Sequence, residues 1–387
     1  MIALAMGGFG IGTTEFVAMG LLPEIADGFS VTESMAGHVI SAYALGVVVG
    51  APIITVLFAR IPRKPMLIAL VATFVIGNLA SVIAPTYETL IAARFLAGFP
   101  HGAYFGLASL AAAYVAKPGQ RAKAVALVMM GLSVANVIGV PIATWMGQNF
   151  GWRSAFVLVA VLGVATIVAI AYWVPAMRDV PPSHPRTELG ALRSPQVLLT
   201  LTVGMVGFGG MFAVYSYISF ALTEESGLPA SLIPVALMVF GVGMVVGNYL
   251  GGVIADRALM PGLFGALSLV VVVLTAFAFA LSNPVTAFIG LFFVAASVSA
   301  TVPGLQMRLM DVAADAQNLA ASLNHAALNL ANAFGAWIGG VVIAAGLGYR
   351  ALPALGAVLA VGGLVVLTIS ALLQRREPPA QVPHLSR

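Results

Sequence analysis

The sequence predicts an all-α membrane protein with twelve transmembrane helices arranged as two pseudo-symmetric six-helix halves. Three observations predict this fold class. Hydrophobic residues make up 61% of the 387 and charged residues only 8%. Apolar stretches of bilayer-spanning length recur along the whole chain, and short motifs repeat at one offset. Because a surface with so little charge would not stay dispersed in water, most of it must face lipid.

The apolar stretches are each close to the roughly 20 residues that a helix needs to cross a bilayer. Charged, proline or glycine clusters separate them. The expected spans are 3–22, 35–58, 65–84, 88–115, 122–146, 153–174, 197–221, 230–254, 261–281, 285–309, 318–343 and 350–373. No basic segment precedes the first stretch and no clear cleavage site follows it, so we expect an uncleaved span and not a signal peptide.

One long polar interruption lies near the midpoint of the chain and carries several arginines and prolines. It divides the sequence into an N-terminal six-helix half, a cytoplasmic linker, and a C-terminal six-helix half with a short cytoplasmic tail. The predicted boundaries are 1–174, 175–195 and 196–387.

The two halves share short motifs. At an offset of 196 or 197 residues, three motifs recur: Gly46-Val-Val-Val-Gly50 as Gly243-Met-Val-Val-Gly247, Ala135-Asn136-Val-Ile-Gly139 as Ala331-Asn332-Ala-Phe-Gly335, and Gly151-Trp-Arg153 as Gly348-Tyr-Arg350. Since the offset covers six spans, the repeats are parallel and are related by an axis along the membrane normal. Such a pair encloses a cavity near the midplane and works by rocking of one half against the other.

The basic residues predict the orientation. With the N-terminus inside, fourteen of the seventeen Lys and Arg fall on cytoplasmic segments, against Arg153 and Arg350 outside and Arg94 within a span. Because cytoplasmic loops carry the excess of positive charge, both termini are expected in the cytoplasm. The predicted location is the cell inner membrane, crossed many times.

Composition also excludes several function classes. There is no cysteine, which excludes disulfides and thiol catalysis, and the net charge of +4 is scattered, which argues against nucleic acid. No phosphate-binding loop is present, and the five histidines do not cluster as in a metal site. We therefore expect no enzyme activity, no cofactor and no metal; the expected partners are a small-molecule substrate, protons and the lipid bilayer.

The loop after the second span resembles a signature of the major facilitator superfamily. The segment 55–64, Thr-Val-Leu-Phe-Ala-Arg-Ile-Pro-Arg-Lys, is similar to G-x-L-x-D-R-x-G-R-K, and Gly252-Val-Ile-Ala-Asp-Arg257 repeats part of it. The resemblance implies a conformational latch at Arg60, Arg63, Asp256 and Arg257. Ala59 replaces the first acidic residue, so the first half lacks that latch carboxylate.

Further motifs resemble the drug/proton antiporter group of this family. Arg94-Phe-Leu-Ala-Gly98 is similar to a signature of proton-coupled members, and the segment 131–141 to a glycine/proline signature of antiporters. Segments 13–24, 100–103 and 322–325 look most like bacterial sugar-efflux (arabinose efflux permease-like) and chloramphenicol-resistance transporters. The resemblance implies a monomer that exports a sugar or an amphenicol-like drug in exchange for protons.

Two charged residues lie inside predicted spans, where ionisable groups are costly and mark function. At 1.5 Å per residue, Glu15 lies roughly 18 Å from the inner end of its span and Arg94 roughly 9 Å from the outer end of its own. Across a core of roughly 30 Å they reach similar depths and could pair. We expect Glu15 to exchange a proton and Arg94 to tune its proton affinity; the alternative is a permanent Glu–Arg pair that braces two helices.

Other polar and aromatic residues are candidates for the substrate path. His101 is a second proton site, a substrate donor or a packing histidine. The candidate cavity residues are Asn136, Asn324, His325, Asn329, Asn332, Tyr215 and Tyr217. The amides either line the cavity or bond neighbouring helices, and the tyrosines either line an apolar pocket or pack.

Two function hypotheses remain open at this point. The first is proton-coupled efflux by alternating access. The alternative is a facilitator or proton symporter of a small metabolite, without export that depends on Glu15. A facilitator would tolerate loss of the Glu15 charge, whereas an antiporter would not.

Overall fold

The computed structural model describes residues 1–57, 61–116, 121–177, 194–313 and 317–375. The helices of the first part of the chain are α1 (Ile2–Gly20), α2 (Leu22–Phe29), α3 (Glu33–Leu57), α4 (Arg63–Ile83), α5 (Tyr87–Gly98), α6 (His101–Val115), α7 (Arg121–Val134), α8 (Val140–Phe150) and α9 (Arg153–Trp173). A π-helical turn, Ala135–Gly139, joins α7 to α8.

The second part of the chain is also helical over its described residues. Its helices are α11 (Pro195–Ser216), α12 (Ile218–Phe220), α13 (Ile233–Arg257), α14 (Leu259–Ala280), α15 (Pro284–Ser299), α16 (Thr301–Val312), α17 (Gln317–Ala344) and α18 (Ala351–Gln374). Most of the predicted linker, 178–193, lies outside the described residues.

Eleven helical segments within the described residues are long and apolar enough to cross a membrane. The prediction of an all-α multi-pass membrane protein is therefore confirmed. The span predicted at 88–115 is not one continuous helix, because α5 ends at Gly98 and α6 begins at His101. Pro100 lies at this break, where it cannot donate a helical hydrogen bond and its ring would clash with the preceding turn.

The backbone repeats at the offset that the motifs predict. Leu21, after α1, has φ −114° and ψ 17°, and Tyr217, after α11, has φ −111° and ψ 18°. Gly151 and Gly348 begin the repeated Gly-Trp-Arg and Gly-Tyr-Arg motifs, and their φ values are +85° and +73°. Residues with a Cβ atom rarely adopt this left-handed backbone conformation, which explains glycine at both positions.

Glycines also bring equivalent helices together. A Cβ on Gly50 of α3 would fall on the carbonyl oxygen of Phe99, and a Cβ on Gly247 of α13 would fall on that of Ala296. Phe99 and Ala296 are 197 residues apart in the sequence, and so are Gly50 and Gly247. The absence of side chains therefore permits the same close helix approach in both parts of the chain.

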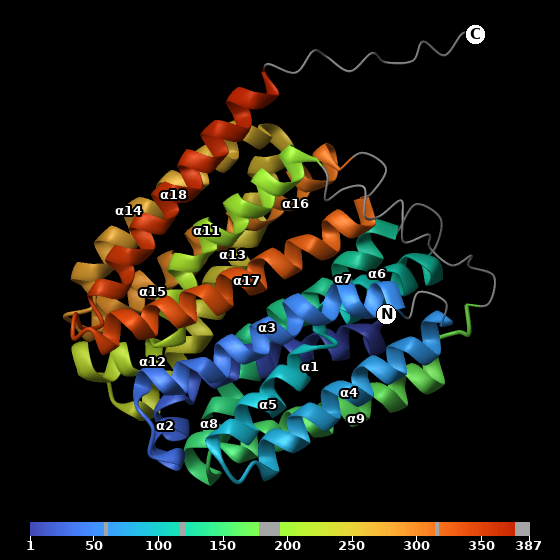
Figure 1. Ribbon diagram of the computed structural model, residues 1–387, viewed down its shortest axis with the longest axis horizontal. Helices are drawn as coiled ribbons and strands as arrows, with labels where there is room; N and C mark the ends of the chain where they lie inside the picture. Colours follow the sequence, from blue (N-terminus) through green and yellow to red (C-terminus); the bar gives the residue numbers. More distant parts are fainter. Residues whose placement is uncertain (58–60, 117–120, 178–193, 314–316, 376–387) are drawn as a thin grey trace.

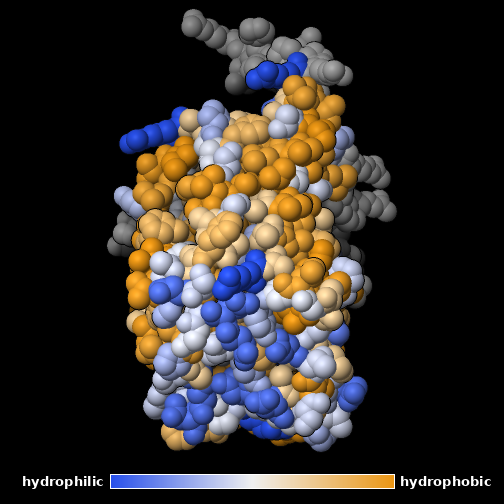
Figure 2. Space-filling model, turned by 90° about the vertical axis from the view of Figure 1, so that its left-hand side faces the viewer, coloured by the Kyte–Doolittle hydropathy of each residue, from blue (hydrophilic) through white to orange (hydrophobic). Residues whose placement is uncertain are grey.

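The long helices run side by side from one end of the molecule to the other (Figure 1). Met1 and the last turn of α18 lie towards one end, and α2 and α12 lie at the other. We call the latter, formed by residues 20–35, 148–153, 217–233 and 345–350, the α2–α12 end. Figure 2 shows hydrophilic residues gathered over the lower part of this side and hydrophobic residues above them, as expected where a polar end meets lipid-facing flanks.

Candidate functional site

A buried polar cluster surrounds Arg94 of α5. Its side chain is 0% exposed, and Glu15 of α1 is 5% exposed. The guanidinium bonds both oxygens of Thr14: Nη1 donates to Oγ1 at 2.9 Å and Nη2 donates to the main-chain carbonyl at 2.8 Å. Arg94 is therefore fastened to the residue that precedes Glu15, and the cluster joins α1 to α5.

Aromatic rings complete the surroundings of the guanidinium. Its carbon lies 4.6 Å from the ring centroid of Tyr43 and 5.1 Å from that of Phe156. The negative faces of such rings attract a cation. Thus α3 and α9 also hold Arg94, and every direct partner found for it among the described residues is electrically neutral.

Glu15 and Arg94 do not form the direct pair that the sequence suggested as possible. Within the described part of the chain, no carboxylate oxygen of Glu15 lies within 4.0 Å of a guanidinium nitrogen. Thr14 takes the Nη1 and Nη2 donors instead, and among the described residues Nε of Arg94 is buried without a partner. Glu15 lies within electrostatic range of Arg94, Tyr43 and Tyr215.

His101 extends the cluster towards the second part of the chain. It is the first residue of α6, is 1% exposed, and its Nδ1 lies 3.1 Å from the Tyr43 hydroxyl. Its ring lies 5.2 Å from that of Phe105, which stacks on His325 of α17 at 5.5 Å and 5°. Contacts between neighbouring side chains thus run without a gap from Arg94 to His325, through Tyr43, His101 and Phe105.

The candidate amides make few hydrogen bonds. Asn324 Nδ2 donates to Gln306 Oε1 at 2.6 Å, which links α17 to α16. Asn136 and Asn329 each donate to the carbonyl four residues earlier, and their Oδ1 atoms are buried without a partner among the described residues. Both amide atoms of Asn332 are buried and likewise have no partner in the described part of the chain. Buried polar groups are rarely left unpaired, so these amides are the unusual polar groups of this region.

The two candidate tyrosines have different surroundings. Tyr215 stacks on Phe240 with centroids 4.0 Å apart and meets Phe16 edge to face at 5.8 Å. It lies beside Glu15 and joins α11, α13 and α1. Tyr217 is not part of this group, because its hydroxyl donates to the Ala336 carbonyl and its ring packs against glycines of α17.

Several hydrogen bonds between the two parts of the chain lie at the α2–α12 end. The Tyr349 hydroxyl donates to Glu33, and Ser219 Oγ bonds the carbonyls of Met19 and Gly20 at 3.0 and 3.1 Å. Gln148 Nε2 donates to the Ala230 carbonyl at 3.0 Å. These bonds hold the α2–α12 end together.

The candidate latch residues lie apart from this cluster. Arg60 lies outside the described residues. Arg63 is half-buried at the start of α4, whereas Asp256 and Arg257 are exposed at the end of α13. Among described residues, no ion pair involves Asp256.

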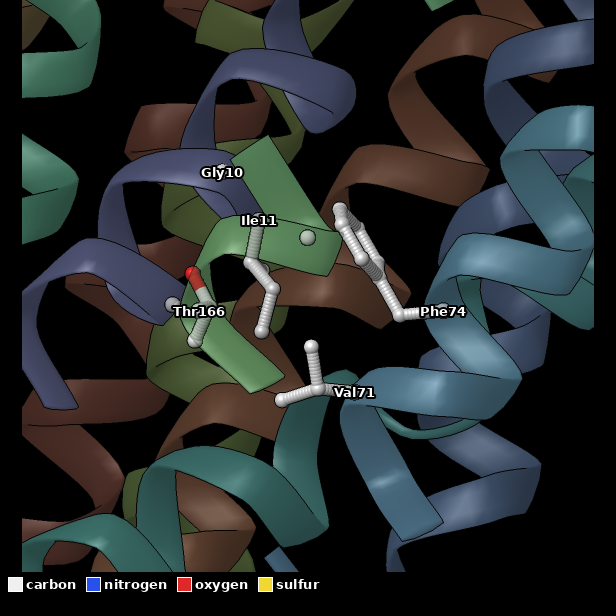
Figure 3. Close-up of a pocket in the computed structure, with 7 residues that line it drawn as sticks. Gly10, Ile11, Val71, Phe74 and Thr166 are labelled. Carbon is white, nitrogen blue, oxygen red and sulfur yellow. The ribbon is translucent and has the colours of Figure 1, made fainter. Parts of the chain in front are cut away.

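Two hollows beside α4 and α9 lie apart from the polar cluster. The gap in Figure 3, lined by Gly10, Ile11, Val71, Phe74 and Thr166, has no room for a water molecule. A groove of about 360 Å³ between α4 and α9 is lined only by alanine, valine and leucine and is open to the surroundings. Neither hollow contains a residue of the polar cluster.

Sequence reasoning missed Thr14 and Asn78 as members of the site. The Thr14 hydroxyl donates to Asn78 Oδ1 of α4 at 2.6 Å, and both residues are 0% exposed. Asn78 is the one side-chain amide in the predicted span 65–84. A lone amide in an apolar span is a usable signal for an interhelical hydrogen bond.

Comparisons with known proteins agree with this architecture. The family model described as Major Facilitator Superfamily matches residues 4–316. The inner membrane transport protein YdhP of Escherichia coli (strain K12) is 45% identical, with 98% of this chain and 96% of YdhP covered. A chloramphenicol resistance protein of Streptomyces lividans is 32% identical, with 95% and 93% covered.

A solved structure shares the fold. A bacterial homolog of the human lysosomal transporter Spinster, in an inward-facing and unoccupied conformation, superimposes with a TM-score of 0.72 at 17% identity and covers 98% of each chain. The protein is a multi-pass membrane transporter of small molecules and not an enzyme. The chain therefore belongs to the Major Facilitator Superfamily.

Proposed function

We propose that the protein is a proton-coupled exporter: it exchanges protons for a small molecule, such as a sugar or an amphenicol-like drug, by alternating access. Glu15 is the proton-exchanging group, and Arg94 sets the charge of its surroundings. The chain works as a monomer in the inner membrane, with both termini in the cytoplasm.

The observation that carries the proposal is a buried arginine with only neutral direct partners beside a carboxyl that makes no ion pair. A buried charge without a counter-ion is costly. Ionised Glu15 offsets the charge of Arg94, whereas protonated Glu15 leaves the cluster with a net charge of +1. Since this difference acts inside the membrane, proton binding alters the relative free energies of the transporter's conformations. A permanently paired brace would not provide this change.

Two halves, residues 1–174 and 196–387, move against each other in this proposal, joined by the linker 175–195. The bonds at the α2–α12 end support a conformation closed at that end. With the proposed orientation the closed end faces outwards and the substrate path opens to the cytoplasm. Exposed Asp256 and Arg257, with Arg63, lie on the cytoplasmic side in this orientation. There they latch the opposite conformation together with Arg60, which is assigned from the sequence alone.

The substrate binds beside the cluster. Tyr215 and Phe240 offer a stacked apolar wall, and Asn136, Asn329 and Asn332 offer unpartnered amide atoms. An apolar wall with a few hydrogen-bonding groups suits a neutral molecule with a ring and hydroxyl or amide groups. The chloramphenicol resistance of one relative supports that class of cargo.

The proposal is tested by counterflow and pH-driven transport in proteoliposomes. The probes are radiolabelled chloramphenicol and a set of monosaccharides and disaccharides. The wild type is expected to concentrate one of these against its gradient when a pH gradient is imposed. Glu15→Gln should lose the uphill movement and keep downhill exchange, because the site remains but cannot carry a proton.

The matched control is Glu88→Gln, which neutralises an exposed glutamate at the start of α5. It should transport as the wild type does. If Glu15→Gln still drives uphill transport with unchanged proton movement, Glu15 is not the coupling residue. If the wild type moves the probe only downhill, the protein is a facilitator, and the exporter proposal is wrong.

A further inference from the structure

We infer that Asn78 of α4 is a positioning residue for Arg94, acting through the Thr14 hydroxyl. This inference rests on the proposed role of Arg94 in proton coupling. The four residues involved lie on three helices, and each link between them is a hydrogen bond: Phe74 to Asn78, Asn78 to Thr14, and Thr14 to Arg94.

The direction of each hydrogen bond follows from the first. The Phe74 carbonyl only accepts, so the amide nitrogen of Asn78 must face it, at 2.8 Å. The Oδ1 of Asn78 therefore faces Thr14 and accepts the hydroxyl proton at 2.6 Å. A hydroxyl has one proton and two lone pairs, so only acceptor capacity remains for Nη1 of Arg94. Asn78 thus makes Thr14 an obligatory acceptor.

Comparison with other hydroxyls shows what Asn78 changes. Thr13, Thr73, Ser81 and Thr166 each donate to the carbonyl four residues earlier in their own helix. Thr14 does not; it donates across to Asn78. Without Asn78, we expect Thr14 to rotate to the usual partner, the Gly10 carbonyl, and to withdraw its oxygen from Arg94.

Loss of that contact would change the environment of Glu15. Arg94 would keep one bond to Thr14, through Nη2 and the main-chain carbonyl, together with the rings of Tyr43 and Phe156. Among the described residues, Tyr215 lies within electrostatic range of Glu15 and His101 bonds Tyr43; neither residue is altered. With one hydrogen bond fewer, the guanidinium takes up other positions relative to Glu15. The pH at which the Glu15 carboxyl is half protonated therefore reports the loss of the bond.

The test uses the purified full-length protein in lipid nanodiscs. Arg94 is observed through nitrogen-15 labelled arginine side chains, with its signals assigned by their loss in Arg94→Lys. Glu15 is observed through its infrared carboxyl band during a pH titration, assigned by Glu15→Gln. The variants are Asn78→Leu, Thr14→Val, the double variant, and the conservative Thr14→Ser.

Asn78→Leu and Thr14→Val should each increase exchange of the Arg94 Nη protons with water about three- to ten-fold, the effect of losing one buried hydrogen bond. Each should move the Glu15 pH midpoint in the same direction by about half a unit. The double variant should add nothing, because both changes act through one chain of bonds. Thr14→Ser keeps the hydroxyl, so its Arg94 exchange rate and its Glu15 pH midpoint should both match those of the wild type.

The matched control is Ser81→Ala, which removes another fully buried polar group from α4 that bonds only to Gly77. It should leave both readouts unchanged. If Asn78→Leu does not fold, Asn78→Ser, which is too short to reach Thr14, is measured in its place. Unchanged Arg94 exchange in either Asn78 variant, or fully additive effects, would overturn the inference. If no band is lost in Glu15→Gln, the coupling proposal fails, while the Arg94 signals still decide the role of Asn78.

Discussion

At the scale of single residues, the charge of Arg94 is separated from the carboxyl that offsets it. Thr14 accepts both guanidinium bonds, and Glu15 follows it in the chain without joining them. The interaction is therefore one of charge through space and not of a shared hydrogen bond. Such an arrangement lets Glu15 gain or lose a proton while Arg94 keeps its partners.

A second glutamate, at the α2–α12 end, gives a pH-dependent prediction. Burial raises the pKa of the Glu24 carboxyl, and hydrogen bonds to its backbone and to Gln148 oppose this in part. A raised folded-state pKa means that stability present below the unfolded-state pKa is lost as the pH rises through the folded one. The thermal midpoint of Glu24→Gln relative to the wild type should therefore increase as the pH is raised from about 4 through the raised folded-state pKa.

Thermal unfolding of the purified protein, followed by circular dichroism, measures this difference. The control is Glu224→Gln, an exposed glutamate in the same region, whose thermal midpoints relative to the wild type serve as the reference. A constant difference for Glu24→Gln across the range would contradict the burial argument.

The sequence identified the members of the site better than their connections. Glu15 and Arg94 stood out because charges are rare in apolar spans, and both lie in the cluster. The direct contact that their similar depths allowed is not formed, and no periodicity shows that a threonine will take two guanidinium bonds. Asn78 was missed because its importance comes from the rotation of a hydroxyl on another helix, which depends on three-dimensional packing.

At the scale of helices, paired glycines determine how closely the helices approach. Gly50 and Gly247 each face a main-chain carbonyl of the neighbouring helix. With no hydrophobic force between helices inside lipid, such close packing is a main source of their association. The same sequence spacing in both parts of the chain therefore produces the same helix contact.

One pair of variants tests this packing on a single helix. Gly247→Ala should destabilise the protein by about 1–3 kcal/mol, because its methyl group meets the Ala296 carbonyl. Gly252→Ala, also on α13, has no neighbour within 4 Å and should be neutral or stabilising by about 0.5–1 kcal/mol. Thermal unfolding of the two purified variants compares them. Equal effects would show that α13 and α15 do not depend on this close approach.

Sequence patterns predicted the helices well, and their interruptions less well. Long apolar stretches follow from the thickness of the bilayer, so eleven of the predicted spans have long apolar helices at or near their predicted positions. The break between α5 and α6 was missed although Pro100 is visible in the sequence. Proline is tolerated in many membrane helices, as Pro52 is within α3, so its presence alone does not predict a break.

At the scale of the whole molecule, the bonds at the α2–α12 end favour one conformation over another. Tyr349 and Glu33 are 316 residues apart in sequence and form the most distant of these hydrogen bonds. Its acceptor is a carboxylate, and such bonds are stronger than bonds between neutral groups. Opening this end requires the bond to break.

Tyr349→Phe should therefore open the α2–α12 end about ten-fold more often, the effect of losing one charge-assisted hydrogen bond. Because the chain has no cysteine, a single Ala36→Cys substitution reports on this end without background. Ala36 is 0% exposed on α3. The labelling rate with a hydrophilic maleimide measures opening.

The control for this experiment is Tyr172→Phe, which alters a tyrosine that is 83% exposed near the other end. In the Ala36→Cys background, the labelling rate with and without Tyr172→Phe should be equal. If Tyr349→Phe labels no faster than this control, the bond to Glu33 does not hold the end closed.

The arginine in the split crossing also bears on how the protein is made. Placing an arginine at the centre of a membrane helix costs about 2.5–3.5 kcal/mol during insertion, and α5 and α6 are only 12 and 15 residues long. Thr14, Tyr43 and Asn78 all precede Arg94 in the chain. When the ribosome delivers the α5–α6 crossing, the partners of Arg94 on α1 and α3 and the Asn78 that orients Thr14 have already been synthesised. The order of synthesis therefore assists the insertion of this arginine-bearing crossing.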